Sequence, residues 1–254
     1  MNAKGSPEAV LIKGLKGLSL PHSEDQISAF MTYLAELKKW NRAYNLTSIK
    51  ADEDIIIKHF LDSLLYIEAL PKGRISVVDV GSGAGVPGIP IKIMKPEIRM
   101  YLAEPAKKKI NFLRHVVKVL GLENIEVLEK RVEDIEGPAV DAVLTRALFA
   151  VTEFVEKASR LLKDDGMFIL SKGPRINEEL AAADKENLNY EVLTRKLPLT
   201  DIKRFLVMIK KNISTEAEGR QARTASHICI NMECRMRKAG CKGFEGCPGF
   251  KARG

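Results

Sequence analysis

Four glycines follow a short apolar run, and together they form the stretch of this sequence best suited to bind a small molecule. The run 75–80 indicates a buried strand, and Gly81, Gly83, Gly85 and Gly88 come directly after it. Glycine adopts positive φ without strain and has no Cβ, so backbone N–H groups can approach a ligand closely. A turn without a ligand is the alternative, but closely spaced glycines are costly in chain entropy. The pattern therefore predicts a ligand-binding strand–turn–helix unit.

Asp79 distinguishes between the two ligand classes that use such a turn. Gly83, Gly85 and Gly88 match the G-x-G-x-x-G pattern of dinucleotide sites, but that match alone is weak. The Asp79 carboxylate stands two positions before Gly81, where a negative charge suits a cationic ligand and repels a pyrophosphate. The stretch Asp-x-Gly-x-Gly-x-Gly resembles the first motif of class I methyltransferases that use S-adenosylmethionine (SAM). We therefore expect Asp79 and the glycines to bind SAM.

Other polar residues fall where later strands are expected to end, which is where ligands bind in an open α/β sheet. Glu104 lies 19 residues after Gly85, the place where an acid accepts hydrogen bonds from the ribose of an adenosine. NAD and SAM both contain adenosine, so Glu104 supports either ligand. A solvated acid at a helix N-terminus is the alternative. The remaining strand-end candidates are Val132, Glu133, Arg146 and Lys172.

The residues before the glycine turn predict a small helical lead-in. Ser23 with Gln26 resembles a capping box, and apolar residues recur at helical spacing after it. A break is expected over 41–47 and a second helix over 52–70. Asn45 lies in the break and His59 on the second helix. For His59, a satisfied half-buried histidine is as good an interpretation as a direct ligand role.

After the glycine turn, strands and helices alternate, which implies right-handed crossovers and a mostly parallel sheet. Two final runs, 190–197 and 204–211, leave no room for a crossover helix and are expected to pair antiparallel. We predict an α/β protein of the class I SAM-dependent methyltransferase (Rossmann-like) fold, with a mostly parallel seven-stranded sheet closed by an antiparallel hairpin. The expected strands are 99–103, 125–129, 140–145 and 167–172, and the helices are 106–120, 150–162 and 176–188, with a turn at 164–166.

Composition places the chain among ordinary soluble proteins. Of 254 residues, 45% are hydrophobic and 29% charged, and no apolar run reaches the length of a membrane span. Without a signal-peptide pattern, a cytoplasmic monomer that contacts no membrane is expected. The net charge of +8 favours a polyanionic partner. We predict three parts: the lead-in 1–73, a SAM-binding core 74–212 and a basic tail 213–254.

Six motifs in order resemble the bacterial small-subunit ribosomal RNA methyltransferase G family, also called GidB-like. They cover roughly residues 25–211, which makes the resemblance far more specific than a glycine pattern. The motifs are Tyr44-Asn45-Leu46-Thr47, Lys58-His59-Phe60-Leu61-Asp62-Ser63, Asp79 to Pro90, Lys108-Lys109 with Phe112-Leu113, Thr145-Arg146-Ala147, and Ser171-Lys172-Gly173-Pro174.

The resemblance implies a SAM-dependent enzyme that methylates N7 of a guanine in the decoding-site loop of 16S rRNA, as naked RNA or within the small ribosomal subunit. Two stretches depart from the family pattern. Glu104 stands where the family has Asp, with Pro105 in place of Ser, and Val86 replaces a bulkier apolar residue. Carried over to this sequence, the SAM contacts are Gly81, Val86, Val132, Glu133 and Arg146, with Glu104 on the ribose.

Guanine N7 is unprotonated at neutral pH, so its attack on a sulfonium methyl needs alignment and no general base. We therefore assign no proton-transfer residue and name Arg146, Lys172, Asn45 and His59 as positioning candidates. Arg146 suits the SAM carboxylate or an RNA phosphate, and Lys172 suits a phosphate, unless it is a solvated strand-end cation. The alternative function is a non-catalytic RNA-binding or ribosome-assembly module that retains a nucleotide pocket. An NAD-dependent dehydrogenase would lack its downstream catalytic domain.

The tail concentrates all four cysteines in the last 26 residues, spaced C-x4-C-x6-C-x5-C-P. Thiolates converging from so short a segment suit a tetrahedral zinc or an iron–sulfur cluster. The spacing differs from that of common zinc ribbons, and a disordered basic tail with free thiols is the alternative. The proposed ligands are Cys229, Cys234, Cys241 and Cys247.

Overall fold

Strand β1 (Ser76–Val80) lies in the interior of the sheet, and apolar side chains cover both of its faces. Val77 belongs to the core cluster on one face, while Val78 and Val80 belong to the cluster on the other. An apolar run buried on both faces is typical of an interior parallel strand. β1 pairs in parallel with β2 (Arg99–Ala103) on one side and with β4 (Val140–Arg146) on the other.

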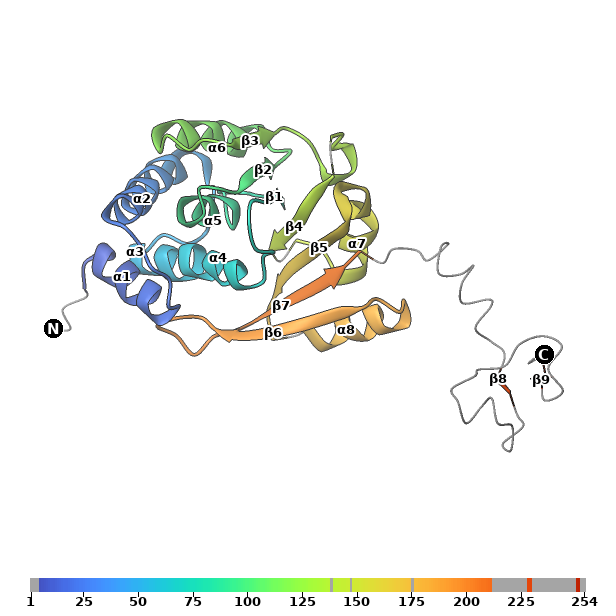
Figure 1. Cartoon of the computed structure of the whole chain (residues 1–254). Helices are drawn as coiled ribbons and strands as arrows, with labels where there is room; N and C mark the ends of the chain where they lie inside the picture. The colour runs from blue at the N-terminus through green and yellow to red at the C-terminus, as the bar shows by residue number, and fades with distance from the viewer. Residues whose placement is uncertain are drawn as a thin grey trace. The chain divides into compact units, whose positions relative to one another are not determined.

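The computed structural model confirms the predicted fold class (Figure 1). Seven strands form one sheet in the order β3-β2-β1-β4-β5-β7-β6. β5 pairs antiparallel with β7, and β7 pairs antiparallel with β6, so a hairpin closes the sheet as expected. The other strands are β3 (Ile125–Leu128), β5 (Leu162–Lys172), β6 (Tyr190–Lys196) and β7 (Lys203–Lys210).

The structure describes residues 5–137, 139–146, 148–174 and 176–211, with the backbone of 228–229 and 250–251. The chain divides into two compact units, 1–211 and 212–254. In the second unit, β8 (Ile228–Cys229) pairs antiparallel with β9 (Phe250–Lys251). None of the helices within the described ranges is long and apolar enough to cross a membrane.

Helices cover both faces of the sheet. Buried residues of α5 and α6 join the core cluster on one face, together with the N-terminal helices, and buried residues of α7 and α8 join the cluster on the other. Within α6, Ile110, Phe112, Leu113 and Val116 are buried. The helices are α5 (Gly88–Met94), α6 (Lys107–Val119), α7 (Val151–Ala158) and α8 (Ile176–Lys185), with 3-10 turns η3 (Val132–Asp134) and η4 (Ser159–Leu161).

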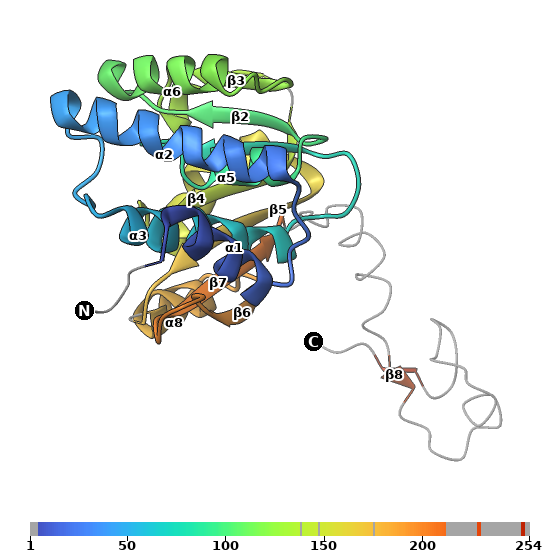
Figure 2. The same ribbon diagram turned by 90° about the vertical axis from the view of Figure 1, so that its left-hand side faces the viewer.

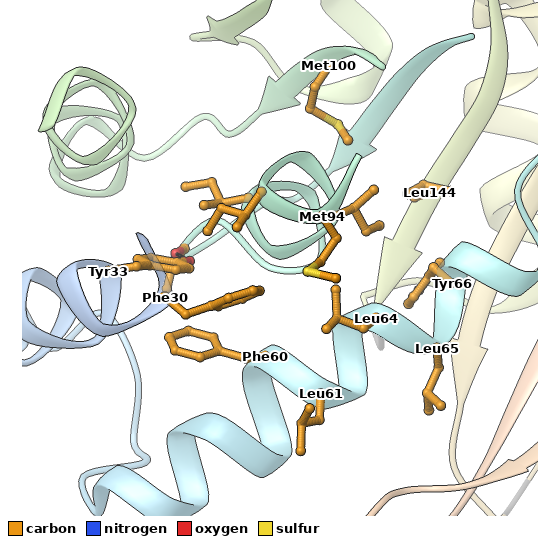
Figure 3. Close-up of a cluster of buried hydrophobic side chains, with 14 of the residues drawn as sticks. Phe30, Tyr33, Phe60, Leu61, Leu64, Leu65, Tyr66, Met94, Met100 and Leu144 are labelled. Atoms are coloured by element: carbon orange, nitrogen blue, oxygen red, sulfur yellow. Dashed lines mark hydrogen bonds between the residues drawn. The ribbon is translucent and has the colours of Figure 1, made fainter. Parts of the chain in front are cut away.

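The helical lead-in packs into the same core as the sheet. Ser23 and Gln26 form the predicted capping box at the start of α2, and Figure 2 shows α2 running alongside α6. Tyr33 stacks on Phe60 beneath α5, and the Phe30 ring packs against Phe60 at a tilt (Figure 3). The lead-in comprises α1 (Pro7–Gly17), α2 (Glu24–Tyr44), α3 (Asp52–Ile55), the π-helical η1 (Ile56–Leu61), α4 (Asp62–Leu64) and the 3-10 turn η2 (Leu65–Glu68).

Three local expectations are wrong. Residues 164–166 form no separate turn but belong to β5, where a bulge lies opposite Val140–Ala142. Gly166 permits the bulge, because a Cβ there would lie 2.7 Å from Leu162 Cγ. Helix α2 continues into the expected break and ends at Tyr44, with Asn45 as its C-cap at a φ of +51°. The single helix expected over 52–70 contains a π-helical turn, a feature often found at functional sites.

Candidate functional site

The glycine turn at the end of β1 leaves open space above one glycine only. Gly81, Gly83 and Gly85 have φ of +73°, +58° and +91°. A Cβ at Gly85 would lie 2.4 Å from Ile89 Cδ1, and Gly81 and Gly88 are as tightly enclosed. A Cβ at Gly83 would meet nothing nearer than the Gly81 carbonyl oxygen, at 3.7 Å. Gly83 is therefore the position where a ligand can approach the backbone.

Asp79 lies beneath the glycine turn and holds it to helix α5. Its side chain is fully buried, and Oδ2 accepts a hydrogen bond from the Gly88 N–H at 2.9 Å. Burial raises the pKa of the Asp79 carboxyl to about 7, although the hydrogen bond from Gly88 acts in the opposite direction and lowers it. Oδ1 is buried and has no hydrogen-bond partner among the residues that the structure describes. Sequence reasoning placed Asp79 against the ligand, whereas in the structure its visible contact is with the turn.

Glu104 holds the same turn from the end of β2. One carboxylate oxygen, Oε2, accepts from the Gly83 N–H at 2.9 Å, and Oε1 accepts from the Ala106 N–H at 3.0 Å. Lys109 Nζ lies 3.7 Å from Oε2. The Glu104 side chain is nearly buried, so its charge is poorly screened by water. The structure thus brings Glu104 and Gly83 together, as the spacing of the sequence predicts.

Tyr33 is a further contact of the glycine turn that sequence reasoning missed. Its hydroxyl donates to the Ala84 carbonyl oxygen at 2.5 Å, and its ring stacks on Phe60. Burial raises the pKa of the Tyr33 hydroxyl, which therefore remains a donor at neutral pH. The lead-in helix α2 thus fixes the position of the turn. No local signal identifies this contact, because Tyr33 reads as one more member of an amphipathic helix.

Val86, Val132 and Glu133 are spread around the turn in different settings. Val86 and Val132 are buried, and the Val132 carbonyl oxygen accepts from Arg160 at 2.7 Å. Glu133 is exposed and pairs with Lys157 at 2.6 Å, a hydrogen bond that lowers the pKa of its carboxyl. The position of η3 at the sheet edge agrees with a role for its backbone, while the Glu133 carboxylate is already paired with a lysine.

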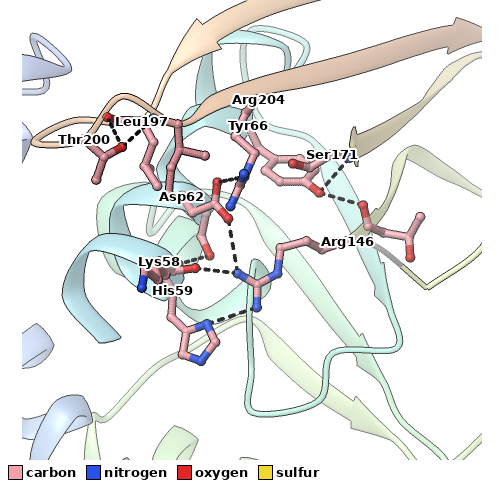
Figure 4. A network of polar contacts seen from close by, with 12 residues as sticks. Lys58, His59, Asp62, Tyr66, Arg146, Ser171, Leu197, Thr200 and Arg204 are labelled. Atoms are coloured by element: carbon pink, nitrogen blue, oxygen red, sulfur yellow. Dashed lines mark hydrogen bonds and ion pairs between the residues drawn. The ribbon is translucent and has the colours of Figure 1, made fainter. Parts of the chain in front are cut away.

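Arg146, at the end of β4, is held by the lead-in (Figure 4). Its guanidinium donates to the Lys58 carbonyl oxygen at 3.0 Å and to His59 Nδ1 at 3.2 Å. It also lies 3.6 Å from Asp62 Oδ2. The side chain is 20% exposed, so part of this rigidly held cation remains accessible. The structure therefore brings Arg146 and His59 together from segments far apart in the sequence.

Asp62 is the buried counter-charge of this network, and sequence reasoning gave it no role. Besides Arg146, it accepts from Arg204 Nε of strand β7 at 2.8 Å. Burial raises the pKa of the Asp62 carboxyl, and the two guanidinium groups oppose that shift. Nearby, the buried Tyr66 hydroxyl donates to the Thr145 carbonyl oxygen at 2.6 Å. The Tyr66 hydroxyl also accepts from the Ser171 N–H at 3.1 Å, so Asp62 and Tyr66 together anchor the ends of β4, β5 and β7 to the lead-in.

His59 is a neutral bridge within this network. Burial, followed by the Arg146 charge, lowers the pKa of His59 to about 4. Because a guanidinium only donates, Nδ1 must accept from Arg146, which leaves the proton on Nε2, 2.8 Å from Thr47 Oγ1. His59 is therefore a satisfied histidine that also orients Arg146. Asn45 lies apart, exposed at the end of α2, beside a cleft of about 300 Å³.

Lys172 was expected to be a solvent-exposed cation, but in the structure it is nearly buried and paired. Its side chain is only 6% exposed, and Nζ pairs with Glu179 Oε2 at 2.7 Å and donates to the Phe149 carbonyl oxygen. Glu179 Oε2 also accepts from the Val151 N–H at 3.1 Å, at the start of α7. The prediction missed this partner, because Glu179 belongs to a helix that reads simply as polar.

The tail prediction lies mostly outside the described residues. Cys234, Cys241 and Cys247 are not described, and only the backbone of Cys229 is. Within the part of the chain that the structure describes, no three His, Cys, Asp or Glu side chains are arranged to hold a metal ion.

The residues at the end of β1 fit SAM. The turn leaves open space beside Gly83, while the N–H groups of its four glycines are bonded within the protein and hold the backbone in place. Two carboxylates from neighbouring strands flank it, and the buried Asp79 Oδ1 has a free acceptor position. The Asp79 carboxylate beneath the turn favours a cation and opposes the pyrophosphate of NAD, while Glu104 suits the adenosine that both ligands contain.

Comparisons with known proteins agree with this geometry. The family model described as rRNA small subunit methyltransferase G matches residues 26–208. A Chromobacterium violaceum protein named ribosomal RNA small subunit methyltransferase G is 40% identical over 200 residues, covering 78% of this chain and 95% of that protein. A Shigella dysenteriae protein of the same name is 36% identical over 199 residues, with the same coverage.

Solved structures support the fold. The ribosomal protein L11 methylase from Lactobacillus delbrueckii subsp. bulgaricus has a TM-score of 0.50 and 15% sequence identity, and the match covers 65% of this chain and 81% of that one. At this identity the likeness concerns the fold alone.

Proposed function

Because the chain belongs to the rRNA small subunit methyltransferase G family, we propose that it transfers the methyl group of SAM to N7 of a guanine in the decoding-site loop of 16S rRNA. The observation that carries this proposal is the glycine turn, with Glu104 bonded to Gly83 and open space above it. When bound, SAM supplies an electrophilic methyl group on a sulfonium.

The residues around the turn bind and orient the cofactor. Glu104, already fixed by two backbone N–H groups, has the position to accept bonds from ribose hydroxyls. Asp79 acts through the turn that it holds, and its buried charge favours a cationic ligand. Arg146 offers its remaining N–H donors to the carboxylate of the cofactor or to an RNA phosphate. Val86 and Val132 supply apolar walls.

Catalysis in this proposal is alignment. Guanine N7 carries an in-plane lone pair and loses no proton on methylation, so no residue acts as a general base. The Asp62 network holds the Arg146 guanidinium before the RNA arrives, which removes an ordering cost from the reaction. The non-catalytic alternative is not favoured, because a module that only bound RNA would have no need for Glu104 and the glycine turn together.

We also infer from sequence spacing that Cys229, Cys234, Cys241 and Cys247 hold zinc or an iron–sulfur cluster beside a basic RNA-binding tail. The test is metal analysis and visible absorption of anaerobically purified protein, with a 1–212 truncation as control. Stoichiometric metal in the full chain alone supports the inference. No zinc or iron, or equal metal in the truncation, contradicts it.

The proposed activity is tested by two measurements on the full chain. Calorimetric titration with SAM and NAD side by side should show binding of SAM only. Incubation with methyl-labelled SAM should transfer label to 16S rRNA, supplied as naked RNA and as assembled subunits, and leave 23S rRNA unlabelled. Binding of SAM without transfer to either form of 16S rRNA would favour the non-catalytic alternative.

A further inference from the structure

A cavity of about 500 Å³ opens between the loops that follow β4 and β5, and no residue of the proposed cofactor site lines it. Lys172 and Glu179 line it with Phe149, Ser171 and Pro174. Ligands of an open α/β sheet bind beyond the carboxyl ends of its parallel strands. The cavity lies at that edge, between the end of β4, which carries Arg146, and the end of β5, two strands from β1 and the cofactor turn.

We propose that this cavity receives the base of the target guanine and that the Lys172–Glu179 ion pair reads its Watson–Crick edge. The proposal rests on the proposed function and names the base-recognition site that it requires. A base must leave its stack to be methylated, so the enzyme needs a pocket of nucleobase size beside the cofactor.

The ion pair has unused hydrogen-bonding capacity of the right kind. An ammonium has three donors, and Lys172 uses two, on Glu179 and on the Phe149 carbonyl oxygen. Glu179 Oε2 accepts from Lys172 and from the Val151 N–H. Its other oxygen, Oε1, makes no hydrogen bond within the described part of the chain. One donor and one acceptor thus stand side by side.

Guanine presents the complementary pair. Its O6 accepts, and its adjacent N1–H and N2–H groups donate, so O6 suits the Lys172 ammonium and N1–H suits Glu179 Oε1. N7 lies next to O6, on the neighbouring edge of the purine, and its in-plane lone pair points to the same side as O6. Hydrogen bonds to O6 and to N1–H therefore leave the N7 lone pair unbonded and available to the methyl donor.

The pairing of Lys172 with Glu179 separates this role from phosphate binding. A carboxylate in contact with the Lys172 ammonium offsets its positive charge and opposes the approach of an anion. A planar neutral base that offers an acceptor and a donor fits such a pair better.

The test replaces the pair as a unit, because removing one partner leaves a buried charge uncompensated. In Lys172→Met/Glu179→Gln, the glutamine carbonyl still accepts from the Val151 N–H. The matched control is Lys163→Met/Asp141→Asn. In that pair, Lys163 Nζ lies 2.8 Å from Asp141 Oδ1, and the Asp141 carboxylate accepts from the Ser76 N–H. The pair lies at the start of β1, which is the opposite edge of the sheet from the cavity.

Both variants and the wild type are assayed with RNA that carries guanine or 2-aminopurine at the target position. 2-Aminopurine keeps N7 and N2 but lacks O6 and the N1 proton. We expect wild type and control to prefer guanine by about 100-fold in kcat/KM, because a site built on hydrogen bonds rejects analogues that lack them. The Lys172→Met/Glu179→Gln variant should lose most of this preference and keep wild-type SAM affinity.

An equal loss on both RNAs would indicate a phosphate contact and overturn the proposal, as would full retention of the guanine preference. Loss of SAM affinity or of the folded state in this variant alone would assign the pair a structural role and also overturn it. Failure of the wild type to methylate the guanine RNA is a separate result, because it removes the proposed function and the base site with it.

Discussion

Replacing Gly83 with Asn should abolish SAM binding while leaving the fold intact. Gly83 has φ of +58° and an open Cβ direction, so the new side chain would occupy the space assigned to the ligand. Asn tolerates this backbone better than any β-branched residue. The chain itself places Asn45, Asn124 and Asn187 at φ of 51°, 51° and 55°.

The magnitudes separate binding from stability. The left-handed conformation should cost the variant about 1 kcal/mol, or a fall of roughly 2–4 °C in Tm for a domain of this size. Blocking the approach to the turn should weaken SAM binding at least about 30-fold, equivalent to ~2 kcal/mol. The hydrogen bond from the residue 83 N–H to Glu104 is a backbone contact and survives the change.

The assay is calorimetric titration with SAM, paired with thermal unfolding of the same samples. Gly121→Asn is the matched control, since Gly121 has φ of +60° and nothing within 4 Å of its Cβ direction. It should show the same small fall in Tm with unchanged SAM affinity. Wild-type affinity in Gly83→Asn would place the ligand elsewhere and refute the argument.

Three further changes test the parts that hold the site. Tyr33→Phe leaves the buried Ala84 carbonyl oxygen without its hydrogen-bond donor. Urea unfolding should show a free energy of unfolding lower by about 1–2 kcal/mol, and calorimetry should show weaker SAM binding. No change in either measurement would contradict the role of Tyr33. Asp62→Asn removes the buried counter-charge of Arg146, so it should lower the free energy of unfolding by about 3 kcal/mol and slow methyl transfer. An unchanged rate of methyl transfer in this variant would show that Asp62 has no part in the reaction. The folded pKa of Asp79, about 7, lies above the reference value of 3.8. The folded state therefore keeps a proton that the unfolded chain releases, and the free energy of unfolding of the wild type should fall by up to ~1.4 kcal/mol per pH unit as the pH rises from about 4 to 7. Urea titrations at several pH values should show that Asp79→Asn removes this dependence on pH. The same dependence in wild type and variant would exclude Asp79 as its cause.

Local patterns in the sequence predicted most of the fold. The apolar run before Gly81 gave β1, and the short link between the last two runs gave the antiparallel hairpin. The bulge at Gly166 escaped prediction because Asp-Asp-Gly has turn composition, and only pairing with β4 keeps it extended. Tertiary contacts here overrule local preference.

The candidate site was predictable where it is local and not where it joins distant segments. The Gly83–Glu104 contact follows from a fixed strand–helix–strand spacing. The contacts of Asp62 with Arg204 and of Lys172 with Glu179 depend on how the sheet and its helices close, and nothing in one sequence marks them. Charged residues that read as surface cations are, in the structure, buried partners of acids.

The most direct test of the central claim is to identify the methylated atom. Purified protein, labelled SAM and 16S rRNA are incubated, and the label is located by nuclease mapping and by the chemical cleavage to which 7-methylguanosine makes RNA susceptible. We predict one labelled guanine in the decoding-site loop, methylated at N7. Label on another atom, or at a site outside that loop, would contradict the account.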